Sequence, residues 1–167
     1  VGLRVKLRFE SADMASLPWE FLHDPRRDEY LALSRTTPIV RHVELAEPQR
    51  PLIVTRPLHV LAMIASPRDL PALDVAQERA RIDSAVAGLE GYIELHWLEG
   101  QTWRDLQSAL QREKWHVFHF IGHGGFSATR GEGIVALCDD AGEAHNLGAT
   151  DLGLLLGDHD SLRLTVL

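Results

Sequence analysis

The sequence contains very little cysteine: Cys138 is the one thiol in 167 residues. A single cysteine excludes an internal disulfide framework, because each disulfide needs two thiols, and it suits a reducing compartment. Lysine is nearly as scarce, since 15 of the 17 basic residues are arginines. No block of basic residues is present, and the net charge is −7. These features argue against a nucleic-acid-binding surface.

Long hydrophobic runs are also missing. No apolar run reaches the ~18 residues that a membrane-spanning helix needs, and no signal peptide opens the chain. We therefore expect a cytoplasmic protein that does not contact membranes. The composition, 45% hydrophobic and 25% charged, is typical of a soluble globular protein, and 167 residues are enough to bury a large core.

Proline is absent after residue 71, and this divides the chain into two kinds of sequence. We expect residues 1–57 to form an N-terminal extension and residues 58–167 to form the core. In the extension, strict apolar–polar alternation over 3–9 predicts a half-exposed strand. A helical turn is expected over 17–22 and an extended segment over 38–45, followed by a proline-rich connector over 46–57.

The core shows strands alternating with helices. Strands are expected over 58–65, 92–98, 115–121, 131–138 and 162–167. Helices are expected over about 75–89, after an N-cap at Thr102, and after an N-cap at Thr150 or Asp151. Alternation of this kind predicts an α/β fold with right-handed βαβ units and a mainly parallel sheet.

The segment 117–125, Val-Phe-His-Phe-Ile-Gly-His-Gly-Gly, is the most informative part of the chain. It reads as a buried strand that ends at His123, a histidine between glycines. Parallel strands present functional residues at their carboxyl ends, and the glycines remove bulk and permit positive φ. Imidazole has an unperturbed pKa close to neutrality, which suits a general base. The alternative is a turn histidine with no chemical role.

Two further ligand sites are disfavoured near His123. His116, His119 and His123 have the spacing of metal ligands on a helix, but their segment indicates a strand and offers no carboxylate or second cysteine at ligand spacing. His119 is more consistent with a buried, hydrogen-bonded histidine. The glycines at 122–125 lack the GxGxxG spacing and the lysine of a phosphate-binding loop. We therefore expect neither a metal nor a nucleotide cofactor.

Cys138 is the one candidate nucleophile within the chain. It ends an apolar strand and precedes Asp139 and Asp140, whose charges would raise the pKa of its thiol. A catalytic thiolate needs an electropositive, accessible setting. The sequence thus favours a structural cysteine.

The segment 119–126 resembles the histidine motif of the CHAT domain family. This is the caspase-like domain associated with tetratricopeptide repeats, within the caspase–gingipain–separase group of cysteine peptidases. The resemblance extends to segments 17–22, 37–41, 65–67, 70–73 and 161–167. It implies a caspase-like three-layer sandwich: a mainly parallel central sheet with flanking helices, plus an extra N-terminal β or extended region.

The resemblance also implies roles for particular residues. His123 would be the catalytic histidine, and the backbone amide of Gly124 an oxyanion-hole donor. No residue of the chain corresponds to the family nucleophile, which counting ~50 residues from the histidine places near ~173. We therefore expect a chain truncated at the tip of a central strand and inactive by itself.

Two functions follow from this resemblance. The first is the histidine-bearing portion of a CHAT-type cysteine endopeptidase, which would cleave protein or peptide substrates with a Cys–His dyad. Its activity would be regulated by repeat or sensor regions outside this chain. The alternative is a non-catalytic caspase-like scaffold, because a fold alone does not establish activity.

Overall fold

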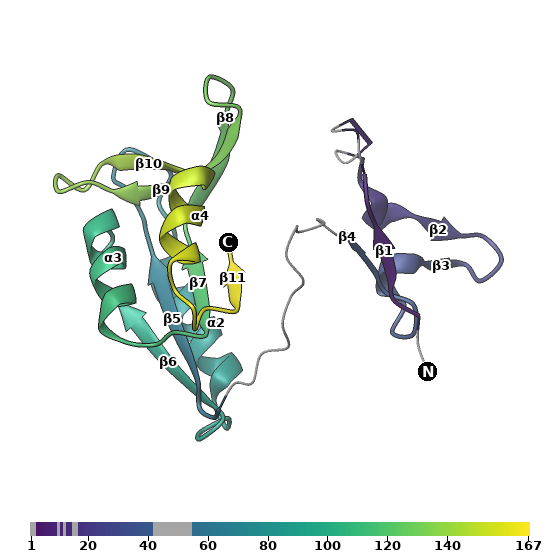
Figure 1. The fold of residues 1–167 in the computed structure, drawn as a ribbon, viewed down its shortest axis with the longest axis horizontal. Helices are drawn as coiled ribbons and strands as arrows, with labels where there is room; N and C mark the ends of the chain where they lie inside the picture. The colour runs from purple at the N-terminus through teal and green to yellow at the C-terminus, as the bar shows by residue number, and fades with distance from the viewer. Residues whose placement is uncertain (1–2, 10, 12, 15–16, 42–54) are drawn as a thin grey trace. The chain divides into compact units, whose positions relative to one another are not determined.

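The computed structural model describes residues 3–9, 11, 13–14, 17–41 and 55–167. The chain divides into two units, Val1–Pro51 and Leu52–Leu167 (Figure 1). The boundary expected from sequence, between residues 57 and 58, lies six residues further along the chain than this division. The connector expected over 46–57 falls largely outside the described residues.

The first unit contains a short parallel pair of strands, β1 (Val5–Leu7) and β4 (Ile39–Arg41). Val5 and Leu7 are half-buried whereas Lys6 is exposed, as the alternation predicts. The expected turn over 17–22 is a 3-10 helix, η1 (Trp19–Phe21). Further elements among the described residues of this unit include β2 (His23–Asp24), β3 (Glu29–Tyr30) and η2 (Leu31–Leu33).

The second unit is built on a four-stranded sheet whose strands are all parallel. Their order is β11 (Leu164–Val166), β7 (Val117–Ile121), β5 (Leu58–Ile64) and β6 (Ile93–Leu98). The central strand β5 is buried from residue 61 to its end. Burial on both faces explains its near-continuous apolar sequence. The expected mainly parallel sheet is confirmed.

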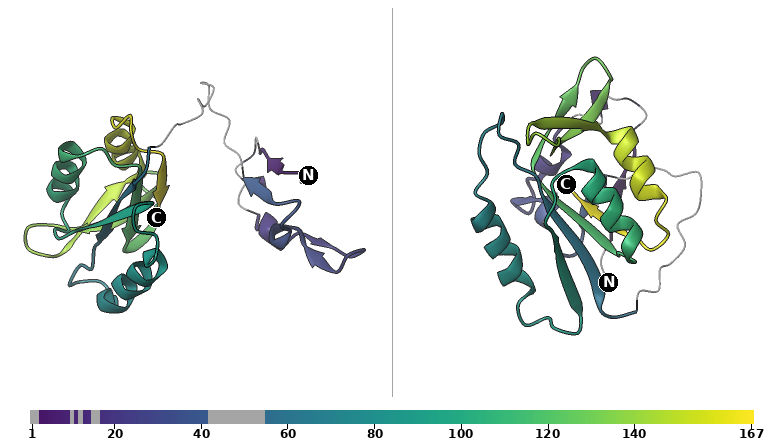
Figure 2. Two further views of the ribbon diagram at one scale, coloured as in Figure 1. Left: turned by 90° about the horizontal axis from the view of Figure 1, so that it is seen from below. Right: turned by 90° about the vertical axis from the view of Figure 1, so that its left-hand side faces the viewer.

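Helices cover both faces of this sheet, so the unit has three layers. Figure 2 shows α2 (Val75–Val86) on one side, with α3 (Trp103–Arg112) and α4 (Ala149–Gly157) on the other. Within the described part of the chain, no helix is long and apolar enough to cross a membrane. The α/β, caspase-like architecture expected from the sequence is therefore present.

The core lies between the sheet and the two helices α3 and α4. Leu61, Met63 and Phe118 of the sheet are almost fully buried, as are Leu106 and Leu110 of α3. These residues belong to one hydrophobic cluster. Trp103, the first residue of α3, is only partly buried and packs against this cluster.

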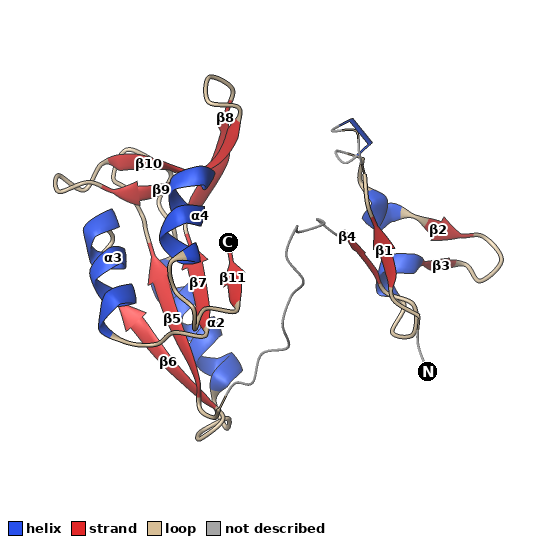
Figure 3. Cartoon of the chain, in the orientation of Figure 1, coloured by secondary structure: helices blue, strands red, loops and turns tan. Residues whose placement is uncertain are grey.

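A second, antiparallel sheet follows the strand β7 directly (Figure 3). Its order is β10 (Ala144–Gly148), β9 (Glu132–Cys138) and β8 (His123–Ser127). The sequence predicts β9 but not its partners. The segment His-Gly-Gly-Phe-Ser has no apolar alternation, and its extended conformation comes from pairing with β9.

The two helix starts on this side of the sheet are capped differently. Thr102 caps α3 as predicted, and it forms a capping box with Asp105. The expectation that Thr150 or Asp151 caps the last helix is wrong, because α4 begins after Gly148. The carboxylate of Glu132, on β9, accepts hydrogen bonds from the Thr150 amide and hydroxyl instead.

The last strand differs from the expected core strand over 162–167. β11 comprises three residues at the edge of the parallel sheet, paired with β7 alone. Leu164 and Leu167 are 54% and 68% exposed. An edge strand has a neighbour on one side, so its apolar side chains are only partly covered.

Candidate active site

His123 lies at the carboxyl edge of the parallel sheet. It is the first residue of β8 and is separated from the end of β7 by Gly122 alone. The Ala65 amide donates to the Ile121 carbonyl at 2.9 Å, so β5 and β7 reach this edge side by side. The carboxyl edge of a parallel sheet is where α/β folds place their ligand sites.

The glycines around His123 act by their small size rather than by backbone freedom. Gly122, Gly124 and Gly125 do not adopt positive φ, contrary to the possibility raised by the sequence. A Cβ at Gly122 would lie 2.4 Å from the Phe120 ring and 3.2 Å from the Ala65 carbonyl oxygen. A Cβ at Gly124 would meet nothing closer than 3.5 Å. Gly122 is therefore required by packing, whereas Gly124 and Gly125 leave their backbone uncovered.

The imidazole of His123 is held by a backbone carbonyl. Its Nε2 lies 2.8 Å from the carbonyl oxygen of Pro71. A carbonyl oxygen can only accept a hydrogen bond, so Nε2 carries the proton in this contact. In the neutral ring, Nδ1 then keeps its lone pair and can accept a proton. Sequence reasoning missed Pro71, because no local pattern relates it to a histidine 52 residues later.

The loop that carries Pro71 is fixed in place by the turn between β9 and β10. The Arg68 amide donates to the Gly142 carbonyl at 3.0 Å, and the Arg68 guanidinium donates to the Ala141 carbonyl. The Asp69 carboxylate accepts a hydrogen bond from the Ala144 amide at 2.8 Å. These bonds hold the loop, and hence the carbonyl that orients His123, against the antiparallel sheet.

Cys138 lies close to His123 in the sheet but has the properties of a structural residue. His123 pairs with Ala136, and Cys138 is two residues further along β9. The cysteine is 7% exposed, and its thiol donates to the Gln101 side-chain oxygen at 3.4 Å. Burial raises the pKa of this thiol, and the charges of Asp139 and Asp69 raise it further. A thiol in these surroundings stays protonated near neutral pH.

The other two histidines near this strand do not join His123. His116 accepts a hydrogen bond at Nδ1 from the His59 amide at 3.0 Å. Burial, followed by the charges of His59 and Arg163, lowers the pKa of His116. His119 is half-buried in β7, where burial lowers the pKa of its ring. His116 lies just before β7, at the opposite end of the strand from His123.

An open apolar cavity of about 390 Å³ begins at Gly124. The backbone of Gly124 and Gly125 forms one wall. The other walls include Ile134 and Leu147 of the antiparallel sheet and Leu152 and Leu156 of α4. The uncovered glycine backbone therefore borders a space that can receive an apolar group.

A comparison of this chain with protein families gave a match. The CHAT domain matches residues 6–167, which include most of the first strand, the His123 segment and the last strand β11. A comparison with curated proteins gave no match. The matched region covers nearly the whole chain, and the α/β fold is consistent with this caspase-like, peptidase-related family. The chain belongs to the CHAT domain family.

Proposed function

We propose that this chain is the histidine-bearing portion of a caspase-like cysteine endopeptidase, with His123 as the histidine of a Cys–His dyad. The observation that supports it most is the 2.8 Å hydrogen bond from His123 Nε2 to the Pro71 carbonyl. A base whose ring is oriented by a third group is the recurring arrangement of activated-nucleophile sites. Its place at the carboxyl edge of a parallel sheet, next to bare glycine backbone, leaves room for a peptide.

The reaction is acyl transfer. His123 takes the thiol proton at Nδ1, and the thiolate attacks the carbonyl carbon of the scissile peptide bond. The imidazolium then donates that proton to the leaving amine as the C–N bond breaks. Water, deprotonated by the same imidazole, hydrolyses the thioester and restores the thiol. The Pro71 carbonyl stabilises the imidazolium that forms in each half of the cycle.

The Gly124 amide is the proposed donor to the oxyanion. β8 lies at the edge of its sheet, with β9 on one side. Alternate N–H groups of an edge strand point away from the neighbouring strand and are available to a ligand. Such donors aimed at the developing charge are typically worth 10²–10³ in rate.

The thiol of this dyad is proposed to come from outside residues 1–167. Cys138 is the one cysteine of the chain, and its burial and raised pKa disfavour a thiolate. The proposal therefore predicts that the 167-residue chain does not turn over peptides. The complete gene product would supply the nucleophile.

A peptidyl acyloxymethyl ketone, which alkylates activated thiolates, tests this assignment. We expect it to label the complete gene product, and we expect His123→Ala to abolish that labelling and peptide cleavage together. His145→Ala is the matched control, because His145 is an exposed histidine of β10, and it should keep both. The 167-residue chain should not be labelled.

Two results would contradict the proposal. Labelling of the 167-residue chain that is lost in Cys138→Ala would make Cys138 the nucleophile. The scaffold function would be favoured if the complete gene product is folded but is not labelled, and if His123→Ala does not change its peptide cleavage. The presence of a single, buried cysteine in this chain is the observation that keeps the scaffold as the second candidate.

A further inference from the structure

A second group of ionisable side chains lies on the α3 face of the parallel sheet, away from His123. His59 belongs to β5, His96 to β6, and Glu113 directly follows α3. One donor atom from each of these residues lies within 4.8 Å of the other two. Among the described residues, this is the group of histidine, cysteine and carboxylate side chains that converges closely enough to hold a metal ion.

Two nitrogens of this group are buried without a hydrogen-bond partner. They are His59 Nδ1 and His96 Nε2, and each has essentially no exposed surface. An unpaired polar atom that is shielded from water carries a desolvation penalty. Such an atom in a folded protein calls for a specific explanation, and an ion at that position is one.

A carboxylate beside the two histidines adds a second negative charge. The Glu94 oxygens lie 3.7 Å from His59 Nδ1 and 3.1 Å from His96 Nε2. Neither contact has hydrogen-bond geometry, so both nitrogens remain without a hydrogen-bond partner. Two carboxylates and two neutral imidazoles together balance the charge of a divalent cation.

The third histidine of this region is not part of the donor set. The His116 ring lies 5.5 Å from the His59 ring, centroid to centroid. Its Nδ1 already accepts the His59 amide proton. The rings of His59 and His96 stack at 6.3 Å with an interplanar angle of 17°. Two imidazolium charges in that arrangement would repel each other, whereas two neutral rings can share one cation.

We propose that His59, His96 and Glu113 bind a divalent transition-metal ion of the zinc class, with Glu94 as the fourth ligand. Imidazole nitrogen and carboxylate oxygen are ligands that zinc takes in tetrahedral sites. Zinc–ligand bonds of about 2.0–2.2 Å bring neighbouring ligand atoms to roughly 3.4 Å. Glu113 is exposed, so its side chain can rotate to close the remaining distance.

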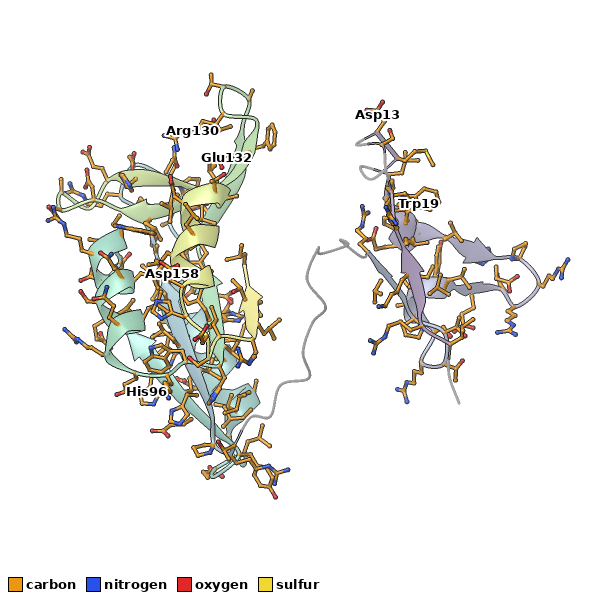
Figure 4. All side chains as sticks on the ribbon, viewed as in Figure 1. Asp13, Trp19, His96, Arg130, Glu132 and Asp158 are labelled. Carbon is orange, nitrogen blue, oxygen red and sulfur yellow. The ribbon has the colours of Figure 1, made fainter. Side chains whose placement is uncertain are left out.

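The ion would join three elements that the chain supplies far apart in sequence. It would connect the start of β5, the strand β6 and the end of α3. Figure 4 labels His96 far along the sheet from Glu132, which belongs to the hairpin that follows His123. The site is therefore separate from the proposed dyad, and its expected effect is on stability.

Titration calorimetry of the 167-residue chain with Zn²⁺, in chelator-free buffer at neutral pH, tests this site. We expect one ion per chain with micromolar or tighter affinity, and a rise in melting temperature upon binding. His96→Gln and Glu113→Gln should each weaken binding at least tenfold. His145→Gln should leave the affinity unchanged, because His145 lies outside the group. Co²⁺ should give the intense visible bands of tetrahedral coordination.

Two outcomes would overturn the metal site. One is the absence of saturable Zn²⁺ binding to the folded chain at 1 mM. The other is an affinity that does not change in Glu113→Gln and His96→Gln. Glu113 is exposed, so its substitution leaves the core intact, and circular dichroism of each variant confirms folding. An ordinary histidine–glutamate ion-pair cluster predicts no tetrahedral Co²⁺ spectrum.

Discussion

The environment of individual residues explains most of the chemistry available to this chain. His123 is oriented by a backbone oxygen, and Cys138 is kept protonated by burial and neighbouring charges. The sequence pointed to His123 because a polar ring between glycines follows an apolar strand. It could not show that the ring contacts Pro71, because that contact depends on how a loop returns to the sheet.

Gly122 is expected to be intolerant of a single added methyl group. In Gly122→Ala, the new Cβ would contact the buried Phe120 ring and a backbone carbonyl. Overpacking of this kind destabilises by about 1–3 kcal/mol. Urea unfolding measures the effect.

Gly153→Ala is the matched control for that substitution. A Cβ at Gly153 meets nothing within 4 Å, and alanine favours the helix by about 0.5–1 kcal/mol over glycine. The control is expected to be neutral or stabilising. Equal effects of the two substitutions would show that crowding at Gly122 is not the cause.

The thiol of Cys138 is expected to react slowly with Ellman's reagent in the folded chain at pH 8. Its burial and raised pKa both reduce the accessible thiolate. Because the pKa of the thiol is raised, the reaction should accelerate only at a pH above the pKa of an ordinary cysteine. Guanidinium unfolding should remove the protection. Rapid reaction of the folded chain would contradict the structural role of this residue.

At the scale of elements, strands with apolar sequences could be predicted, and strands made by pairing could not. Apolar residues predict the strands β5, β6 and β7. The threonine at position 102 predicts the N-cap of α3. β8 and β10 were missed because glycine, histidine and asparagine dominate them. The start of α4 was misplaced because its capping carboxylate, Glu132, comes from a strand 18 residues earlier than Thr150.

The capping box of α3 is expected to contribute measurably to stability. Thr102→Ala removes the hydroxyl that accepts the Asp105 amide and donates to the Asp105 carboxylate. The loss should be about 1 kcal/mol, measured by urea unfolding at pH 7. Ser108→Ala, an exposed substitution in the same helix, should change stability by less than about 0.5 kcal/mol.

The contribution of this cap is also expected to depend on pH. Hydrogen bonds from the Thr102 hydroxyl and amide lower the pKa of Asp105 below its ordinary value of 3.8. A lowered folded-state pKa stabilises the fold above the unfolded-state pKa, and this stabilisation is lost as the pH falls through the folded-state value. The difference in the free energy of unfolding between the wild type and Thr102→Ala should therefore become smaller below about pH 4. A difference that stays constant to pH 2.5 would contradict this linkage.

At the scale of the whole molecule, the second unit is stabilised by a hydrophobic cluster of buried residues. Its members lie between Leu61 and Leu152, most of them on the parallel sheet, α3, α4 and the antiparallel sheet. The sequence predicted this core from apolar patterning. It could not predict the His59, His96 and Glu113 group, because residues separated by 37 and 17 positions form no local pattern and converge only after the sheet and α3 have packed.

Phe118 is expected to be the most sensitive single position of this cluster. It is 1% exposed, whereas Phe126 on β8 is 69% exposed. Phe118→Ala should destabilise by about 3–5 kcal/mol through lost burial and a residual cavity. Phe126→Ala removes the same atoms from a solvated site and should cost less than about 0.5 kcal/mol. Chemical denaturation compares the two, and similar losses would place the core elsewhere.

The orientation of His123 by a main-chain oxygen has a consequence for genetic experiments. Every amino acid presents the same carbonyl, so replacing the side chain at position 71 leaves the hydrogen-bond acceptor in place. A deep mutational scan would therefore score this position as permissive even while its backbone holds the imidazole. Deletions or insertions between residues 66 and 74, which displace the oxygen itself, are the changes that would expose its contribution.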